Sequence, residues 1–157
     1  MKKLILTTLS FCFSLSVLFS QTNNSENTLH HSTFVEVGGN ALSYSLNYEY
    51  KILLSQNSKL AFRTGFSAYP IINKDVDLVV LPGINLLIGH KHNFELGANL
   101  GYCIAQTTNF IIPSATIGYR FQSKNGLLLR ADFTPYFIPY FDNNPHLKGG
   151  ISVGYSF

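Results

Sequence analysis

Eight charged residues of this chain stand at the polar positions of segments in which polar and apolar residues alternate. Four are acidic and four are basic: Glu36, Glu49, Glu95 and Asp132, and Lys51, Arg63, Arg120 and Arg130. Such groups form ion pairs, and an unpaired ion held away from water costs several kcal/mol. The equal numbers therefore predict a structural network of salt bridges inside the protein. The alternative is a gate, in which rearranged ion pairs open a narrow path for ions or small solutes.

The other reactive side chains predict no catalytic site. A hydrolase or acyltransferase needs a nucleophile beside a base, but no Ser-His-acid arrangement is readable around any histidine. The five histidines are His30 and His31 in a polar leader, His90 and His92 in a turn, and His146 in a loop. Two ligands in one turn are too few for a structural metal site, and Cys103, at a small-residue position, is expected to pack inside. We therefore expect no enzyme activity, no metal and no cofactor.

The charged residues belong to eight segments with the period of a two-sided β-strand. The clearest runs over residues 42–52, where the even positions are Leu, Tyr, Leu, Tyr, Tyr and Ile and the odd ones Ser, Ser, Asn, Glu and Lys. The others are residues 33–39, 60–68, 78–89, 94–105, 111–122, 127–134 and 150–157. At about ten residues per tilted strand, this number matches a small barrel that crosses a membrane.

The composition of the two faces distinguishes a membrane barrel from a soluble barrel or sandwich, which has the same period. The polar face is mostly Gly, Ser, Asn, Ala and Thr, and charged residues make up only 12% of the chain. A solvated exterior normally carries far more Lys and Glu. The apolar face has an aromatic girdle near one end of its strands: Tyr48, Tyr50, Phe62, Phe94, Tyr119, Phe121, Tyr155 and Phe157. The sequence predicts an all-β fold, an eight-stranded antiparallel up-and-down transmembrane β-barrel.

The beginning of the chain predicts export. Residues 1–20 contain Lys2 and Lys3, a mainly apolar run and then Ser20, which is the pattern of a cleaved signal peptide. A flexible polar leader is expected over residues 21–32 and the barrel over residues 33–157. Without the two lysines of the signal, the 11 Lys and Arg fall to 9 against 8 Asp and Glu, so no basic surface for nucleic acid is expected.

The connections differ between the two ends of the predicted barrel. Short turns at residues 56–58, 90–92 and 123–125 share the end at which the last strand finishes, which in an outer-membrane barrel is periplasmic. At the other end we expect a tight Gly-Asn hairpin near residues 39–41 and longer loops over residues 69–76 and 139–146, whose aromatic residues serve either partner binding or contact with lipid headgroups.

Three prolines stand at lipid-facing positions in the outer half of their strands: Pro82, Pro113 and Pro135. Each removes a donor from the hydrogen-bond ladder. We expect bulges or local fraying there; the alternative is that these segments are loops and the wall is shorter on that side.

Three stretches of the sequence resemble a known family. They are residues 38–49, Gly-Gly-Asn-Ala-Leu-Ser-Tyr-Ser-Leu-Asn-Tyr-Glu, residues 117–120, Ile-Gly-Tyr-Arg, and residues 150–157, Gly-Ile-Ser-Val-Gly-Tyr-Ser-Phe. With them, the mature chain resembles the small OmpA-like outer-membrane β-barrel proteins of Bacteroidota, most of which are uncharacterised. The resemblance implies a barrel surrounded by outer-membrane lipid. It also implies that Tyr155 and Phe157 belong to a C-terminal signal read by the barrel assembly machinery.

We therefore expect a monomeric outer-membrane barrel with a lumen plugged by side chains and with a structural or surface-interaction role. A small or gated pore for ions or small solutes is the alternative. A soluble periplasmic lipocalin-like binder is the third interpretation.

Overall fold

The computed structural model describes residues 29–41, 43–69, 77–105, 108–139 and 144–157. The strands are β1 (His31–Gly38), β2 (Tyr44–Ser55), β3 (Ser58–Tyr69), β4 (Asp77–Val80), β5 (Gly83–Gly89), β6 (His92–Ile104), β7 (Phe110–Gln122), β8 (Leu127–Tyr136) and β9 (His146–Ser156), and a short 3-10 helix, η2 (Gly39–Ala41), joins β1 to β2. The expected signal peptide and most of the expected leader lie outside the described residues. Because β1 begins at His31, His31 and Ser32 belong to the wall and not to the leader.

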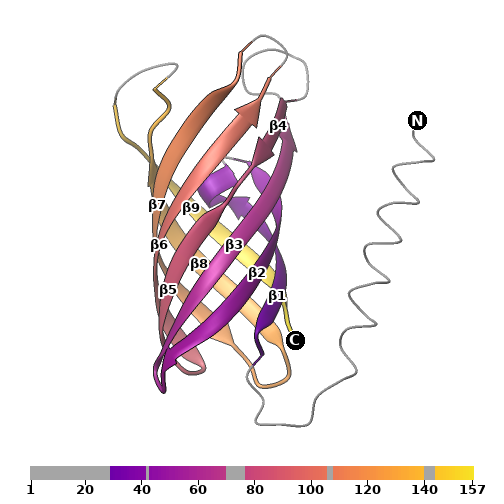
Figure 1. The fold of residues 1–157 in the computed structure, drawn as a ribbon, viewed down its shortest axis with the longest axis vertical. Helices are drawn as coiled ribbons and strands as arrows, with labels where there is room; N and C mark the ends of the chain where they lie inside the picture. Colours follow the sequence, from indigo (N-terminus) through magenta and orange to yellow (C-terminus); the bar gives the residue numbers. More distant parts are fainter. Residues whose placement is uncertain (1–28, 42, 70–76, 106–107, 140–143) are drawn as a thin grey trace, which may run out of the picture.

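These strands close into a barrel (Figure 1). β4 and β5 each pair with β3 on one side and β6 on the other, so together they form one interrupted strand of the wall. The first and last strands also pair, from Ser32 opposite Ser156 to Gly38 opposite Gly150. The predicted eight-stranded antiparallel barrel with up-and-down order is confirmed.

The polar positions of the strands point into the barrel and the apolar positions point outward. Along β6 and β8, burial alternates almost residue by residue. The outward Phe133 and Ile151 are 63% and 67% exposed, whereas the inward Glu36 and Glu95 are 0% exposed. In a water-soluble protein the large apolar side chains lie inside and most charged side chains lie outside, so the two faces are reversed here. Fully buried Glu and Arg are rare unless they are paired.

The prolines interrupt the wall locally at two of the three places, Pro82 and Pro135, and shift no register. Pro82 lies in the gap between β4 and β5, yet Leu81 beside it still exchanges both backbone hydrogen bonds with Gly65, and the Pro82 carbonyl accepts from the Leu100 N–H at 2.9 Å. The interruption is local because proline lacks only its own donor.

Pro113 is paired with β6 and Pro135 with β9 without a register shift. On its other side, Pro135 lies in a gap of the β7–β8 ladder between the pairs Ser114–Tyr136 and Ile117–Phe133. The register shift of the β2–β3 pair lies instead between Leu53 and Ser55, at the turn end.

Three short connections join β2 to β3, β5 to β6 and β7 to β8 at one end of the barrel, here called the turn end, which is the lower end in Figure 1. The expected longer loops are at the other end, where residues 70–76 and 140–143 lie outside the described residues.

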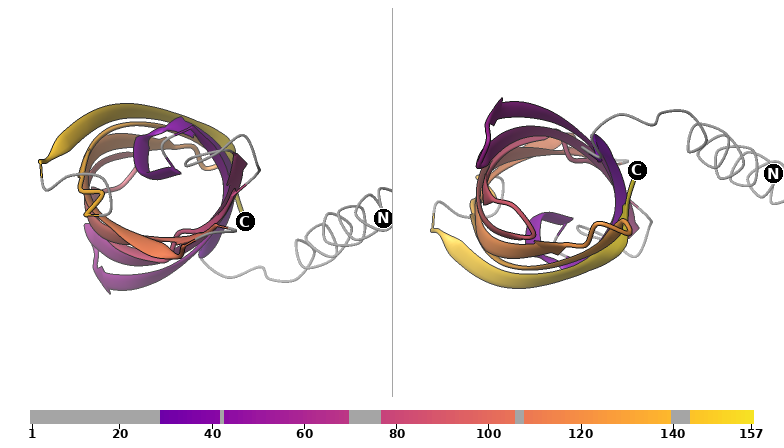
Figure 2. Two further views of the ribbon diagram at one scale, coloured as in Figure 1. Left: turned by 90° about the horizontal axis from the view of Figure 1, so that it is seen from above. Right: turned by 90° about the horizontal axis from the view of Figure 1, so that it is seen from below.

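The connection from β1 to β2 is not the expected tight hairpin. Seen along the barrel, η2 lies inside the ring of strands (Figure 2). Gly38 and Gly39 have φ of 78° and 57°, in the left-handed region that glycine adopts at no steric cost. A Cβ at Gly39 would also meet the Glu36 carboxylate, so side chains and turn share a crowded interior. In the described part of the chain, no helix is both long enough and apolar enough to cross a membrane.

Candidate functional site

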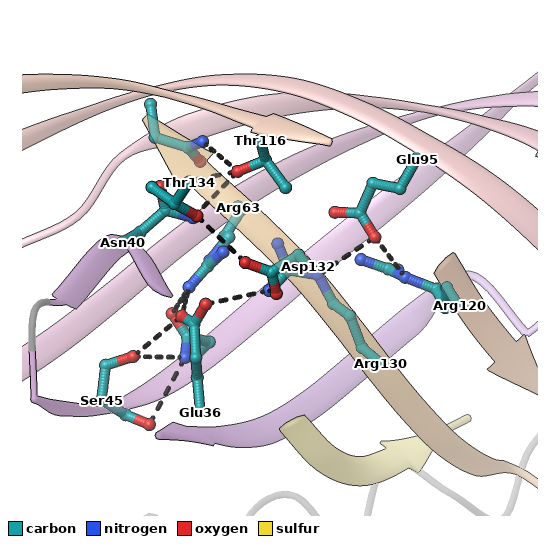
Figure 3. A network of polar contacts seen from close by, with 12 residues as sticks. Glu36, Asn40, Ser45, Arg63, Glu95, Thr116, Arg120, Arg130, Asp132 and Thr134 are labelled. Atoms are coloured by element: carbon teal, nitrogen blue, oxygen red, sulfur yellow. Dashed lines mark hydrogen bonds and ion pairs between the residues drawn. The ribbon is translucent and has the colours of Figure 1, made fainter. Parts of the chain in front are cut away.

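Seven of the eight predicted charged residues form one buried ion-pair network inside the barrel. Figure 3 shows the part of it without Glu49. They come from six strands: Glu36 on β1, Glu49 on β2, Arg63 on β3, Glu95 on β6, Arg120 on β7, and Arg130 and Asp132 on β8. All seven side chains are 0% exposed. The alternation of each strand places its charge on the inner face, and closure of the barrel brings the charges together.

Arg120 holds two carboxylates at once. Its Nη1 and Nη2 donate to the two carboxylate oxygens of Glu49 at 2.5 and 2.9 Å, and its Nε donates to Glu95 Oε2 at 2.9 Å. A bidentate pair of this kind is the strongest side-chain hydrogen-bonding arrangement available to arginine. Arg120 thus ties β7 to β2 and β6.

Arg130 continues the network from the same carboxylate. Its Nε donates to Glu95 Oε2 at 3.1 Å, and its Nη1 donates to Glu36 Oε1 at 3.2 Å and lies 3.4 Å from Asp132 Oδ2. Arg120 and Arg130 are direct cross-strand neighbours, a placement that is unfavourable for like charges. The shared Glu95 carboxylate between them offsets this repulsion.

Glu36 is the second bridging carboxylate (Figure 3). One of its oxygens binds Arg130 and the other accepts from Arg63 Nη2 and from the Ser45 hydroxyl. Arg63 is held in turn by Asn47, whose Oδ1 accepts from Nε at 2.9 Å. The arrangement is therefore a continuous chain of alternating charges from β3 through β1, β8, β6 and β7 to β2.

An aromatic ring stands among the three arginines. The guanidinium carbons of Arg63, Arg120 and Arg130 lie 5.2, 5.9 and 5.8 Å from the ring centroid of Phe34. These distances fall within the range of cation–π attraction, about 6 Å. Phe34 was missed as a site residue, although its place on the same parity as Glu36 already directed it inward.

A layer of neutral polar groups surrounds η2. Asn40 donates to Thr116 Oγ1 at 3.1 Å and accepts from the Ser114 hydroxyl at 2.8 Å, and Asn99 donates to the same Thr116 oxygen at 3.0 Å. These bonds fasten η2 to β7 on the far side of the lumen. Asn40 was expected only as a turn residue, and nothing in its local sequence indicated this second role.

An apolar cluster occupies the inner face of β4, β6 and β7 towards the end opposite the turns. It consists of Val79, Leu81, Cys103, Phe110 and Ile112, with Ala105, Tyr136 and Ile138 packed against it. Cys103 is fully buried there, as expected. The lumen thus changes from charged to polar to apolar along its length.

Lys51 is the predicted charged residue that stands apart from the network. In the part of the chain that the structure describes, its Nζ donates to the hydroxyls of Ser32 at 2.8 Å and Ser156 at 3.4 Å, and it has no carboxylate within ion-pair distance. The network holds three arginines against four acids, so Lys51 completes the formal charge balance from a position nearer the turn end.

Four atoms of the network have no hydrogen-bond partner among the described residues: Arg63 Nη1, Arg130 Nη2, Glu95 Oε1 and Asp132 Oδ2. Buried polar atoms are usually satisfied, and one left unsatisfied costs about 1–3 kcal/mol. The network therefore contains N–H donors and carboxylate oxygens that make no hydrogen bond to the described residues.

The remaining predicted residues lie on or near the outer wall. Tyr155 is exposed on β9, and the Phe157 ring stacks on His31 with 5.7 Å between centroids. His92 pairs with the Tyr119 hydroxyl at 2.5 Å, whereas His90 faces the mouth of the barrel, so the two rings do not form one site. Among the described residues, no group of three His, Cys, Asp or Glu side chains is placed to hold a metal ion.

Comparisons with known proteins bear on the fold. No protein-family model and no curated protein sequence matches the chain. Among solved structures, it is similar to the N-terminal β-barrel domain of Pseudomonas aeruginosa OprF, with a TM-score of 0.53 and 12% sequence identity over 81% of this chain and 95% of that one. Membership of a Bacteroidota family stays a prediction. At this identity the likeness concerns architecture alone, and it supports an OmpA-like eight-stranded barrel.

Proposed function

We propose that this protein is a monomeric outer-membrane β-barrel with a closed lumen and a structural or surface-interaction role in the cell envelope, without a catalytic step. The observation that carries the proposal is the inverted distribution of side chains. Large apolar groups cover the outside, where Leu147 is 69% exposed, while the charges are inside. Exposed apolar area of this extent would be a liability in water and is the normal lipid-facing surface of a membrane barrel.

The dimensions of the wall support the same proposal. β2 and β3 have 12 residues and β6 and β7 have 13, enough for a tilted transmembrane strand of about 9–11 residues. Exposed aromatic residues form two rows, one near the turn end and one near the other end, as expected for side chains at the two membrane interfaces. The first row includes Tyr48, Tyr50, Phe94, Tyr119 and Tyr155, and the second includes Tyr44, Phe66, Tyr102 and Phe137.

We orient the barrel with its turn end in the periplasm, because outer-membrane barrels have short periplasmic turns and longer outer loops. Surface interaction would then involve the loops around residues 70–76 and 140–143, which lie outside the described residues. Assembly would use Tyr155 and Phe157 as the signal for the barrel assembly machinery.

The side chains inside the barrel support a closed lumen. The ion-pair network, which surrounds Phe34, is followed along the axis by η2 and then by the apolar cluster. An eight-stranded barrel is just wide enough for its own side chains to fill. We expect the wild-type protein to give no steady conductance in planar bilayers.

A gated pore is the second candidate, favoured by the unpartnered atoms of Arg63, Arg130 and Glu95. Arg130→Ala, which removes the residue between Glu36 and Glu95, tests it, with the uncharged change Asn125→Ser in an exposed turn as the control. Openings in the wild type, or openings added by Arg130→Ala alone, support a pore. If neither protein conducts, the pore proposal fails and the closed lumen stands.

Membrane location is tested by comparing boiled and unboiled samples of protein from the outer-membrane fraction on a gel. A folded membrane barrel resists the detergent, so the unboiled sample is expected to migrate differently. Recovery from the soluble periplasmic fraction without a mobility shift would contradict the proposal and favour a lipocalin-like binder.

A further inference from the structure

Four lysines gather around the mouth of the barrel at the turn end, where the proposed function gives them no role. They border a cavity of about 480 Å³ together with Gln122 and Ser123, and we call this site the cationic vestibule: Lys51, Lys59, Lys91, Lys124, Gln122 and Ser123. The cavity is of the size that accommodates small molecules in proteins, about 300–1,000 Å³.

The vestibule concentrates positive charge in a lining that holds no carboxylate among the described residues. In the described ranges, none of its four lysines forms an ion pair with a carboxylate. The nearest acid along β2, Glu49, is held by both terminal nitrogens of Arg120. Glu49 attracts Lys51, whereas Arg120 and Lys59 repel it, and Arg120 also repels Lys59.

Different elements bring these side chains together. Lys51 is on β2 and Lys59 on β3, while Lys91 and Lys124 stand in the turns between β5 and β6 and between β7 and β8. Lys91 Nζ lies 5.1 Å from the ring centroid of Phe121, a residue on the outward parity of β7, so its charge stands at the outer rim of the mouth. The cations therefore approach the cavity from several sides of the mouth and do not form a stripe on one strand.

The floor of the vestibule is Lys51, whose Nζ donates to the hydroxyls of Ser32 and Ser156 at 2.8 and 3.4 Å. Lys51 is only 2% exposed. The neutral donors in the lining of the cavity are Gln122 and Ser123. A lysine acts as a compact point charge for phosphate, and hydroxyl and amide groups donate to the remaining phosphate oxygens.

We propose that the cationic vestibule binds a phosphate-bearing anion. Its size and open mouth fit two sources of that chemistry, a soluble phosphate compound and the headgroup of an anionic phospholipid at the membrane surface. In the orientation proposed above, the vestibule opens towards the periplasm. Binding depends on the described residues and not on that orientation.

The test uses the mature, folded protein in a nonionic detergent micelle and measures heat of binding by titration calorimetry. Inorganic pyrophosphate probes the soluble source. Short-chain phosphatidylglycerol, compared with phosphatidylcholine of the same chain length, probes the headgroup. The variant is Lys59→Gln with Lys124→Gln, and the control is Lys148→Gln, which removes a lysine of β9 at the opposite end.

We expect saturable binding that weakens with added salt, because screening reduces attraction between exposed charges. The double variant should weaken it by about a hundredfold, since it loses two charge-assisted hydrogen bonds and each is worth about one decade in affinity, while Lys148→Gln should leave it unchanged. Binding of pyrophosphate identifies a soluble phosphate compound, and binding of phosphatidylglycerol alone identifies the lipid headgroup.

Absence of binding to either probe overturns the inference, as does binding that Lys59→Gln with Lys124→Gln leaves unchanged. The mobility of unboiled protein on a gel keeps this failure separate from failure of the barrel proposal. A protein that keeps its heat-dependent shift but binds no phosphate refutes only the vestibule.

Discussion

Replacing Arg120 with methionine removes the cation that joins Glu49 to Glu95 while keeping an unbranched side chain. Glu95 would retain its bond from Arg130 at 3.1 Å. Glu49 would lose both hydrogen bonds that the structure gives its carboxylate, at 2.5 and 2.9 Å. The variant thus leaves a fully buried carboxylate without its partner.

The expected cost follows from that stranded charge. Breaking a buried ion pair by removing one partner destabilises a protein by about 3–5 kcal/mol. With a urea dependence of about 2 kcal/mol per molar, the midpoint of unfolding should fall by about 2 M. Adding Glu49→Gln neutralises the stranded group, so the double variant should lose less than the sum of the two single variants, with a coupling energy of about 1–3 kcal/mol.

The assay is urea unfolding of the barrel in phospholipid vesicles. The chain contains no tryptophan, so the transition is followed by circular dichroism and by the gel mobility of unboiled samples. Lys124→Gln, in an exposed turn, is the control and should stay within about 0.5 kcal/mol of the wild type. Unfolding of Arg120→Met at the wild-type midpoint, or strict additivity in the double variant, would refute the reasoning.

Three further changes test other parts of the barrel. Ile117 is 49% exposed near the middle of β7, so Ile117→Arg should cost about 2–4 kcal/mol in vesicles, and a negligible loss in the same urea assay would argue against lipid on that face. Asn40→Ala removes the bonds that fasten η2 inside the lumen and should lower stability by about 1–3 kcal/mol, seen as a lower temperature of the gel shift; an unchanged temperature contradicts the anchoring role. Gly126 has a φ of 93° and faces the Tyr155 ring, so Gly126→Ala should cost about 1–3 kcal/mol by the same measurement, and a neutral effect would show that the turn relaxes.

The architecture could be predicted because lipid and lumen demand different side chains at alternating positions. Residues 94–105 alternate large apolar groups with Glu95, Asn99, Cys103 and small residues, and β6 buries that second set. Seven of the eight charged residues could be assigned to one network for the same reason. The parity of a residue along its strand determines which face its side chain is on. Once the barrel closes, the inward charges are shielded from water and form ion pairs with one another.

The details of the interior could not be predicted, because they depend on contacts between distant strands. A Gly-Gly-Asn sequence is compatible with a tight hairpin. The inward position of η2 is explained by the hydrogen bonds of Asn40 with Thr116 and Ser114, which are far from it in the sequence. The prolines were expected to distort the wall at three places; the wall is interrupted at Pro82 and at Pro135 on its β7 side, whereas Pro113 keeps its pairing with β6. The position of Phe34 among three guanidinium groups likewise depends on the diameter of the barrel.

The seam between β1 and β9 has a consequence for how the chain reaches this structure. The bonded hydroxyls of Ser32 and Ser156 are 124 positions apart, so this contact carries a large loop-closure entropy and raises the contact order, which slows folding. Glu36 lies on the same strand β1 and bridges Arg63 and Arg130. Until the seam closes, an incomplete sheet presents free edges and an apolar face, both of which promote aggregation. A chain built this way needs protection from self-association for the whole interval between synthesis and closure.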